Sequence, residues 1–301
     1  RRGGHEPFFC PGLVVFVAMP TRVRRSPPEP VMKAGLMRLA LAAAHHDSAE
    51  LDAADLATLC LAVQMGVLDT LTPTERWGLL AEALLAPHPA YFFSALRACG
   101  GLKRLLPELD ALFGVPQLGD TQEFVDVGLH QLRLVEQTAQ IDAPLAVRFA
   151  ALMHKIGMGG TPREIWPSHY KHEQRAQALL DGLARRFALP DDALALARLV
   201  VDECERVHRA SDMRAGAIAA LLERLQAAEQ PDRFDQLLSV CSCDYAAYPG
   251  HSIAGYPKAP RLRRALAAYV RVDVTGLPAD EALQRRAEAI AVALRSHARL
   301  G

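Results

Sequence analysis

The chain of 301 residues carries 34 Lys and Arg against 34 Asp and Glu, so its formal net charge is zero. This balance excludes a globally basic nucleic-acid-binding protein and an acidic disordered chain, but it leaves room for local basic patches. The length suggests about two domains with a sizeable core. No apolar run approaches the ~20 residues of a membrane helix. Residues are 50% hydrophobic but only 6% aromatic, which favours helices over sheets. Six scattered cysteines in a chain of this size indicate reduced thiols and a cytoplasmic protein.

The first 31 residues differ from the rest. A short apolar run at 13–19 follows a basic start, which is a feature of signal peptides, but prolines flank it and no small-residue cleavage site follows. The alternative is a single buried strand or an extended arm packed on the body. Residues 22–30, rich in Arg and Pro, predict an exposed, extended linker.

From Val31 onward the apolar residues recur at helical spacing nearly everywhere. Asp52 is placed to cap one helix, and Thr72 followed by Pro73 opens another that runs through Leu85. Further helices are expected at 89–98, 124–139, 143–157, 170–188, 190–209, 213–229, 231–243, 259–270 and 279–298. Residues 107–122 contain two prolines and two glycines and are expected to be the longest loop and a domain boundary. The sequence therefore predicts an all-α protein.

Histidines carry the most chemical information. His130 lies within a predicted helix, and His154 lies where a buried helix gives way to a Gly-rich turn. Asp244 ends a later helix, and His169 and His172 fall between them in the chain. Imidazole and carboxylate groups converging from helix ends are common ligands of divalent metals, although histidines also serve as caps and core residues.

The sequence segments around these residues resemble those of a known protein family. The strings GGLKRLLPELDALFGVPQ (100–117), VGLHQL, RFAALMHKIGMGGTP, PSHYKHE and LARLVV are similar to the C-terminal half of bacterial CCA-adding tRNA nucleotidyltransferases. The resemblance runs from about 68 to 295 and includes a final helix, EALQRRAEAIAVAL. It implies a helical neck and body (32–118), an HD-type phosphohydrolase domain (119–257) and tail helices (258–301), with 1–31 as an arm or the remnant of a head.

The same resemblance implies departures in the head and the neck. The family's nucleotidyltransferase head carries an Asp-x-Asp pair that holds two metal ions, and this chain has no such pair before its helical body. Only Glu6-Pro7-Phe8 is similar to a turn of that head. In the neck, the family's base-reading motif EDxxR aligns with 28–32, where Met32 replaces the arginine. The related Glu-Arg motif appears at Glu75-Arg76, shifted by one residue. Nucleotide addition is therefore not expected.

The HD site departs as well. By resemblance, its metal ligands map to His130, His154, Lys155 and Asp244, so that a lysine replaces the aspartate of the family's His-Asp pair. An ammonium beside a dication costs several kcal/mol even at an effective dielectric constant of about 20. Two hypotheses follow. A weakened divalent metal (Mg, Mn or Ni) could stay on His130, His154 and Asp244, aided by His169 or Cys204. Alternatively, Lys155 fills the metal position and forms an ion pair with Asp244.

Two other residue groups have competing interpretations. Cys241 and Cys243, with Cys204 and His251, could bind zinc, but residues two apart on a helix point in different directions, which favours buried, uncharged thiols. Basic clusters could contact tRNA phosphates, as the resemblance implies for the body and tail, or they could be ordinary solvated surfaces. One such cluster is Lys103-Arg104. The arginines expected to contact RNA are Arg185, Arg186, Arg261, Arg263, Arg264, Arg285 and Arg286.

The leading hypothesis is a degenerate relative of the CCA-adding enzyme that binds tRNA, other RNA or a protein partner and is impaired in catalysis. The alternative is a metal-dependent HD phosphohydrolase acting on 2′,3′-cyclic or 3′-phosphate ends, in which His169, His172 and His208 hold the phosphate. A third hypothesis is a fragment whose head belongs to another chain or an upstream coding segment.

Overall fold

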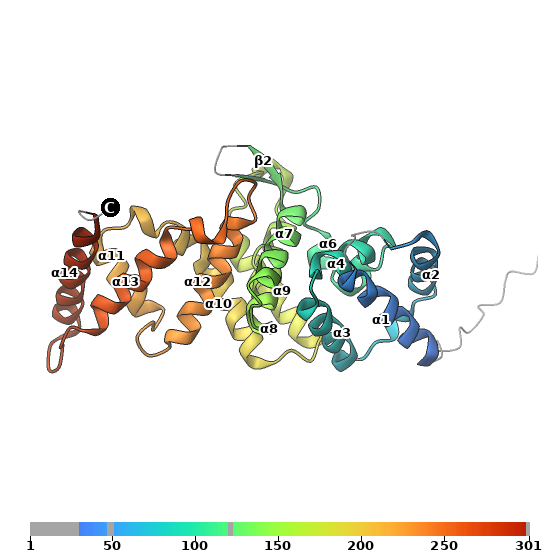
Figure 1. Ribbon diagram of the computed structural model, residues 1–301, viewed down its shortest axis with the longest axis horizontal. Helices are drawn as coiled ribbons and strands as arrows, with labels where there is room; N and C mark the ends of the chain where they lie inside the picture. The colour runs from blue at the N-terminus through green and yellow to red at the C-terminus, as the bar shows by residue number, and fades with distance from the viewer. Residues whose placement is uncertain (1–29, 47–50, 120–122, 299–301) are drawn as a thin grey trace, which may run out of the picture.

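A computed structural model describes residues 30–46, 51–119 and 123–298 of the chain (Figure 1). The segment 1–29, which includes the apolar run, most of the linker and the head-like turn, lies outside the described residues. The described part is built almost wholly from helices, so the all-α prediction is confirmed. Within these ranges, no helix is both long and apolar enough to cross a lipid bilayer.

The α-helices and strands follow one another in this order. They are α1 (Pro30–His45), α2 (Ala53–Gln64), α3 (Pro73–Leu85), α4 (Pro89–Ala98), α5 (Leu102–Leu105), α6 (Pro107–Asp110), β1 (Pro116–Leu118), β2 (Phe124–Asp126), α7 (Val127–Gln140), α8 (Leu145–Met153), α9 (His172–Arg186), α10 (Asp191–His208), α11 (Ala215–Arg224), α12 (Pro231–Ala246), α13 (Lys258–Val270) and α14 (Ala279–Ala298). Short 3-10 helices connect them: η1 (Val67–Thr70), η2 (Ile156–Met158), η3 (Arg163–Ile165), η4 (Ala210–Asp212) and η5 (Ile253–Gly255).

Local capping sets several of the helix boundaries. The Asp52 side chain accepts a hydrogen bond from the Asp55 amide at the start of α2. Thr72 and Glu75 form a reciprocal capping box at the start of α3, in which each side chain accepts from the other residue's amide. Each interaction satisfies amide groups that the first turn of a helix leaves without partners. The predicted starts of these two helices are thereby confirmed.

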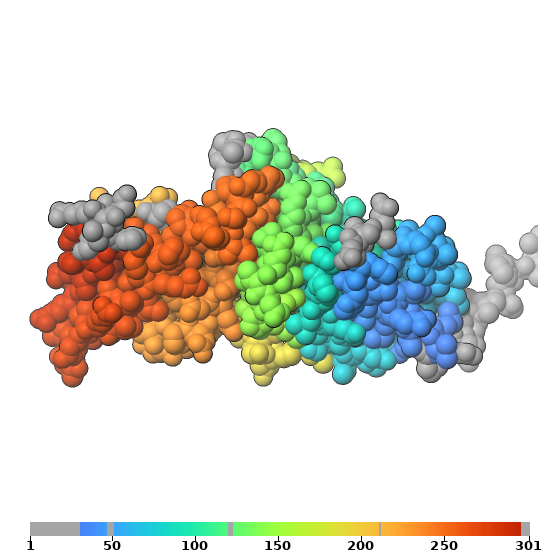
Figure 2. Space-filling model, viewed as in Figure 1, coloured from blue at the N-terminus to red at the C-terminus, as the bar shows by residue number. Residues whose placement is uncertain are grey.

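The helices are arranged along an elongated body. Figure 1 shows α1 and α2 at one end, α7 to α10 in the middle, and α13 and α14 at the other end. The space-filling view shows these parts joined without a break (Figure 2). Apolar side chains from α1 through α14 form one continuous core, in which α8 packs against α7 and α10, and α10 packs against α12. The middle of the body therefore brings α8, α10 and α12 together.

Three predictions of local structure need correction, and the first is the helix expected at 124–139, which begins only at Val127 because 124–126 form β2. Residues 107–122 are not only a loop, because α6 lies there and β1 pairs with β2 in an antiparallel hairpin. The predicted helix at 143–157 ends at Met153, and a 3-10 turn follows. The 3-10 turn packs closely against α9: a Cβ on Gly157 would lie only 1.9 Å from the carbonyl oxygen of His172. The break places His154 and Lys155 at the end of α8.

Candidate functional site

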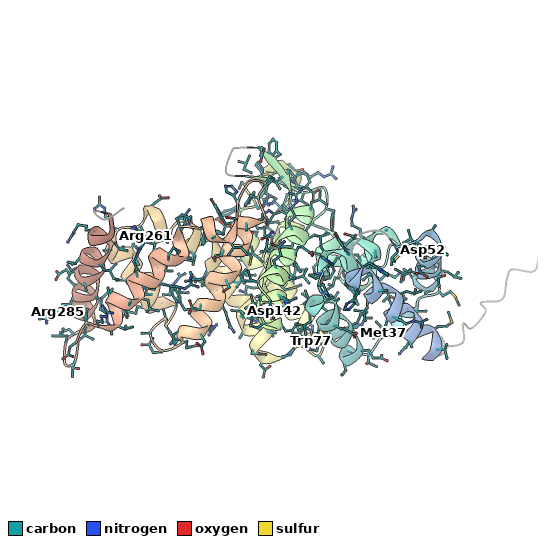
Figure 3. The ribbon with its side chains drawn as sticks, viewed as in Figure 1. Met37, Asp52, Trp77, Asp142, Arg261 and Arg285 are labelled. Atoms are coloured by element: carbon teal, nitrogen blue, oxygen red, sulfur yellow. The ribbon has the colours of Figure 1, made fainter. Side chains whose placement is uncertain are left out.

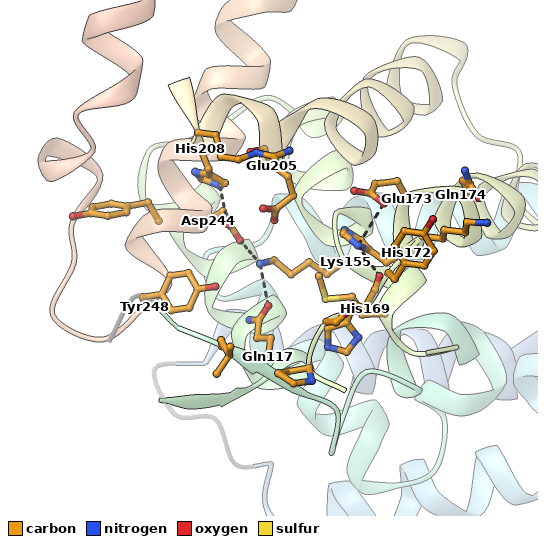
Figure 4. A pocket seen from close by; sticks show the side chains of 18 of the residues that line it. Gln117, Lys155, His169, His172, Glu173, Gln174, Glu205, His208, Asp244 and Tyr248 are labelled. Atoms are coloured by element: carbon orange, nitrogen blue, oxygen red, sulfur yellow. Dashed lines mark hydrogen bonds and ion pairs between the residues drawn. The ribbon is translucent and has the colours of Figure 1, made fainter. Parts of the chain in front are cut away.

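The Asp244 carboxylate on α12 is the centre of the candidate site, and only 2% of the residue is exposed. Its Oδ1 atom lies 2.8 Å from His130 Nε2 and 3.3 Å from Lys155 Nζ. Its Oδ2 atom lies 3.0 Å from His208 Nε2 (Figure 4). Three nitrogen donors from α7, α10 and the end of α8 thus converge on one buried carboxylate. The predicted ion pair between Lys155 and Asp244 is present.

Lys155 is buried as deeply as its partner, with 2% of the residue exposed. Its ammonium donates to Gln117 Oε1 on β1 at 3.2 Å and lies 5.8 Å from the ring centroid of Tyr248. Burial by itself would lower the pKa of Lys155, but the Asp244 carboxylate outweighs this effect and raises it. The lysine is therefore charged and is held by a carboxylate, an amide and an aromatic ring.

Two further charges complete a balanced cluster. Burial would lower the pKa of His208, but Cys204 and Asp244 hold it well above its usual value, so His208 is cationic. Burial would raise the pKa of Glu205, yet Lys155 and His208 lower it, and the pKa of Asp244 is held well below its usual range by Lys155 and His130 despite burial. Two cations, Lys155 and His208, therefore face two anions, Asp244 and Glu205, in a poorly solvated space. Glu205 was not predicted; its spacing of three residues before His208 on one helix was the available signal.

His130 and His154 are neutral. Burial is the main cause that lowers the pKa of His130, and burial lowers the pKa of His154 to about 3. His130 donates its Nε2 proton to Asp244. His154 Nε2 lies 3.9 Å from Asp244 Oδ1, and neither ring nitrogen of His154 has a hydrogen-bond partner among the residues described.

His169 and His172 lie on the far side of Lys155 from Asp244 (Figure 4). His169 donates its Nε2 proton to the Pro116 carbonyl at 2.8 Å, and its Nδ1 accepts from the Thr161 hydroxyl at 3.0 Å. His172 Nδ1 donates to the His169 carbonyl at 3.1 Å, while its buried Nε2 has no hydrogen-bond partner within the described ranges. Of the two, only His172 keeps a ring nitrogen for a ligand.

Most of these residues, but not His130, His154 or Cys204, line a cavity of about 710 Å³ that is open to solvent. Its wall carries four basic side chains and three acidic ones in addition to the histidines. The basic ones are Lys155, Lys171, Arg209 and Lys258, and the acidic ones are Glu173, Glu205 and Asp244. A cavity of this size and polarity suits a small, charged ligand better than an apolar one.

The family resemblance implies a divalent metal on His130, His154 and Asp244, but the residues present do not fit one. The position next to Asp244 Oδ1 that a cation would take is held by the Lys155 ammonium. A metal there would face a buried positive charge at contact distance and would lack the oxygen ligand of the missing aspartate.

The structure does not bring together the four residues of the zinc hypothesis, Cys204, Cys241, Cys243 and His251. Cys204 Sγ on α10 lies 3.2 Å from Cys241 Sγ on α12, and His208 Nε2 lies 3.4 Å from Cys204 Sγ. Cys243 and His251 belong to neither of the groups of potential metal ligands found in the described part of the chain. The Cys-x-Cys spacing therefore brings only its first cysteine to Cys204.

Comparison with known proteins gives this geometry its context. No protein-family model matches the chain. The multifunctional CCA protein of Nitrosospira multiformis is 40% identical over 220 residues, which is 73% of this chain and 53% of that protein. Those of Ralstonia nicotianae and Burkholderia cenocepacia are 42% and 41% identical, covering 70% and 79% of this chain and 49% and 60% of their own length. This chain is a homologue of the multifunctional CCA proteins. It spans about half the length of these relatives, which is consistent with the predicted match to their C-terminal part.

The residues aligned with the family's neck have structural roles here. Glu75 caps α3 and forms an ion pair with Lys33 at 3.1 Å. Arg76 donates to the backbone carbonyls of Leu68 and Leu71 at the turn before α3. Both side chains therefore stabilise the packing of α1, η1 and α3.

The predicted RNA-contacting arginines fall into two separate groups. Arg185 and Arg186 lie at the end of α9, in the middle of the body, and the others lie on α13 and α14 at one end (Figure 3 labels Arg261 and Arg285). Four of them have partners: Arg186 pairs with Glu108, Arg263 with Asp235, Arg285 with Glu281, and Arg286 donates to the Tyr269 hydroxyl. The other three, Arg185, Arg261 and Arg264, form no ion pair within the described residues.

Proposed function

We propose that this tRNA nucleotidyltransferase-related chain is an RNA-binding protein of the cytoplasm whose HD-type site does not hydrolyse phosphate esters. In this proposal, the neck and body (32–118), the HD-like domain (119–257) and the tail (258–301) together form the binding surface. The observation that carries the loss of hydrolysis is the contact of 3.3 Å between Lys155 Nζ and Asp244 Oδ1.

This ion pair supports the loss of activity for a physical reason. A metal-dependent hydrolase uses its cation to bind and polarise water and phosphate oxygens, which requires open coordination positions. The Lys155 ammonium neutralises Asp244 without offering any such position, and its raised pKa means that it provides no basic amine at neutral pH. The Lewis acid is lost, and the positive charge that replaces it is balanced by Asp244.

The cavity supports binding of a phosphate group. Lys171, Arg209 and Lys258 line its wall, and the unpartnered Nε2 of His172 is available to a phosphate oxygen. Phosphate contacts of this kind position a nucleic acid without reading its bases. We infer that the cavity holds a phosphate of the bound RNA without cleaving it.

The experiment is a binding titration of purified, full-length chain with labelled tRNA at several salt concentrations. We expect an affinity that falls linearly on a log–log plot against salt, with a slope of about −0.7 to −0.9 per phosphate contacted. No product should form when 2′,3′-cyclic or 3′-phosphate nucleotides are added with Mg, Mn or Ni. Absence of tRNA binding at low salt would overturn the RNA-binding role.

A substitution tests the reason for the loss of hydrolysis. Lys155→Asp restores the His-Asp pair and should create stoichiometric Mn or Ni binding that the natural chain lacks, as measured by metal analysis after gel filtration. Lys155→Met removes the ammonium without adding a ligand and should gain no metal. If the natural chain already holds one tightly bound metal and cleaves a cyclic phosphate, with both properties lost in Asp244→Ala, the phosphohydrolase hypothesis replaces this one.

A further inference from the structure

Next to the ion pair, α10 and α12 bring together a set of soft ligands. Cys204 and His208 are four residues apart on α10, so they point from the same side of that helix. Cys241 faces them from α12. The two Sγ atoms are 3.2 Å apart, and His208 Nε2 is 3.4 Å from Cys204 Sγ. We propose that Cys204, Cys241 and His208 form a site for a thiolate-binding metal, with Zn²⁺ as its ion.

The separations of these atoms suit tetrahedral zinc. Bond lengths of about 2.3 Å to sulfur and about 2.0 Å to nitrogen place two sulfurs ~3.8 Å apart and a sulfur and a nitrogen ~3.5 Å apart. The two sulfurs, now 3.2 Å apart, must therefore move apart to admit the ion, while His208 Nε2 is already close to its required distance from Cys204 Sγ. Two thiolates balance the charge of Zn²⁺, and His208 gives up its own positive charge on binding, so no positive charge is added beside Lys155.

The imidazole of His208 is already oriented for this role. Its Nδ1 proton is directed to the Tyr256 hydroxyl at 2.8 Å. A hydrogen bond of this kind from the distal nitrogen fixes the ring, as in many zinc sites. Nε2 lies 3.0 Å from Asp244 Oδ2 and 3.4 Å from Cys204 Sγ, so metal binding would replace its hydrogen bond to the carboxylate. Tyr256 is itself buried, so the contact is held by the core.

His154 lies beside this set of ligands without belonging to it. A ring nitrogen of His154 lies within 4.8 Å of both Cys204 Sγ and a carboxylate oxygen of Asp244. His154 is fully buried, and neither of its nitrogens has a hydrogen-bond partner in the described part of the chain. His154 does not share a group of mutually close ligand atoms with Cys241 or His208, so the proposed site has three protein ligands and leaves its fourth position to a water molecule.

Binding has a defined proton balance. Each thiol loses its S–H proton to solvent as an S–Zn bond forms, and His208 releases its Nε2 proton as the N–Zn bond forms. No electrons are transferred. The site differs from the metal centre that the resemblance implies, because sulfur replaces oxygen and Lys155 remains paired.

The test uses full-length protein that has been reduced and freed of metal, titrated with Co²⁺ and then Zn²⁺. We expect one equivalent of Co²⁺ to give the near-ultraviolet sulfur-to-cobalt charge-transfer band, and Zn²⁺ to abolish it. Cys204→Ser and Cys241→Ser should each lose much of that band and weaken binding about tenfold or more. Cys243→Ser is the matched control, since this buried cysteine lies on α12 two residues from Cys241 and should keep the full band.

Native mass spectrometry is applied to the natural chain, so its result does not depend on whether a variant folds. It should find one zinc, with a mass gain reduced by the protons released. The proposal is overturned by cobalt binding without a charge-transfer band, by an equal loss in Cys243→Ser, or by a disulfide between Cys204 and Cys241 in place of bound metal.

Discussion

At the scale of single residues, Lys155 is held through its charge by three neighbours. The Asp244 carboxylate is its ion-pair partner, the Gln117 amide oxygen accepts a second hydrogen bond, and the Tyr248 ring lies near its ammonium. All of these groups are poorly solvated, so removing the cation leaves a buried carboxylate with too little compensation. Breaking a buried pair in this way is more damaging than the pair is stabilising.

Lys155→Met tests this argument through stability. We expect the free energy of unfolding, measured by urea denaturation, to fall by about 3 kcal/mol, because Asp244 and Glu205 then share only one cation, His208. Lys171→Met is the control: Lys171 is an exposed residue of the same cavity, and its substitution should change stability by less than about 0.5 kcal/mol. Equal, small effects in the two variants would show that the ion pair is not holding the site.

The buried histidines predict a stability maximum in metal-free protein. His154 and His130 have lowered pKa values, so the unfolded chain binds protons below pH 6.5 that the folded chain does not, and stability falls as the pH drops. His208 has a raised pKa, so its contribution is complete below pH 6.5 and is lost as the pH rises through the folded value. Each group changes the unfolding free energy by about 1.4 kcal/mol per pH unit.

Urea denaturation across the pH range should therefore show highest stability near pH 6.5 from these three groups. His154→Gln should flatten the acidic side of the profile, and His208→Gln should flatten the alkaline side. A monotonic profile, or variants that leave both sides unchanged, would contradict the assigned protonation states.

At the scale of secondary-structure elements, the sequence predicted best where local chemistry sets a boundary. The capping side chains Asp52 and Thr72 bond to amides only three residues further along the chain. The local sequence was therefore sufficient to predict where α2 and α3 begin. The hairpin of β1 and β2 was missed because strands of three residues carry no alternation to read. The end of α8 was missed because its apolar pattern continues into the 3-10 turn, which packs against α9.

Gly157→Ala tests that packing. A Cβ at this position would overlap the His172 carbonyl oxygen at the start of α9, which is backbone and cannot move aside like a side chain. We expect a loss of about 3 kcal/mol or more in unfolding free energy, since overpacking against fixed atoms is strongly destabilising. Gly160→Ala is the matched control, because its nearest neighbour is the flexible Arg175 side chain at 3.6 Å. Calorimetry of both variants makes the comparison, and equal melting temperatures would refute the close contact.

At the scale of the whole molecule, the candidate site is assembled from distant parts of the chain. His130, Lys155 and Asp244 were predicted to meet, because the family resemblance supplied the fold that the residues alone could not. Gln117 and Glu205 were not predicted, since their approach to Lys155 depends on the hairpin register and on the rotation of α10. Patterns within one helix do not determine such three-dimensional relations.

Because the chain has no net charge, it can attract RNA only through local groups of positive side chains. On α13, Arg263 is already engaged by Asp235 at 2.8 Å, whereas Arg261 and Arg264 form no ion pair within the described residues. Only unpaired guanidinium groups are free to replace the counterions of an RNA backbone. The double variant Arg261→Gln/Arg264→Gln should therefore weaken tRNA binding and reduce the salt slope by about 1.5.

Arg263→Gln is the matched control on the same helix. Its side chain must leave Asp235 before it contacts phosphate, so its loss should change the salt slope by well under 1. Fluorescence anisotropy with labelled tRNA at four salt concentrations measures both slopes, and circular dichroism checks that each variant is folded. A double variant with the natural slope would place the RNA elsewhere, and the cluster of Arg185 and Arg186 on α9 would then be the surface to test. The sequence alone gives no reason to separate the three arginines of α13. The folded chain does, because only Arg263 has an ion-pair partner, Asp235, among the described residues.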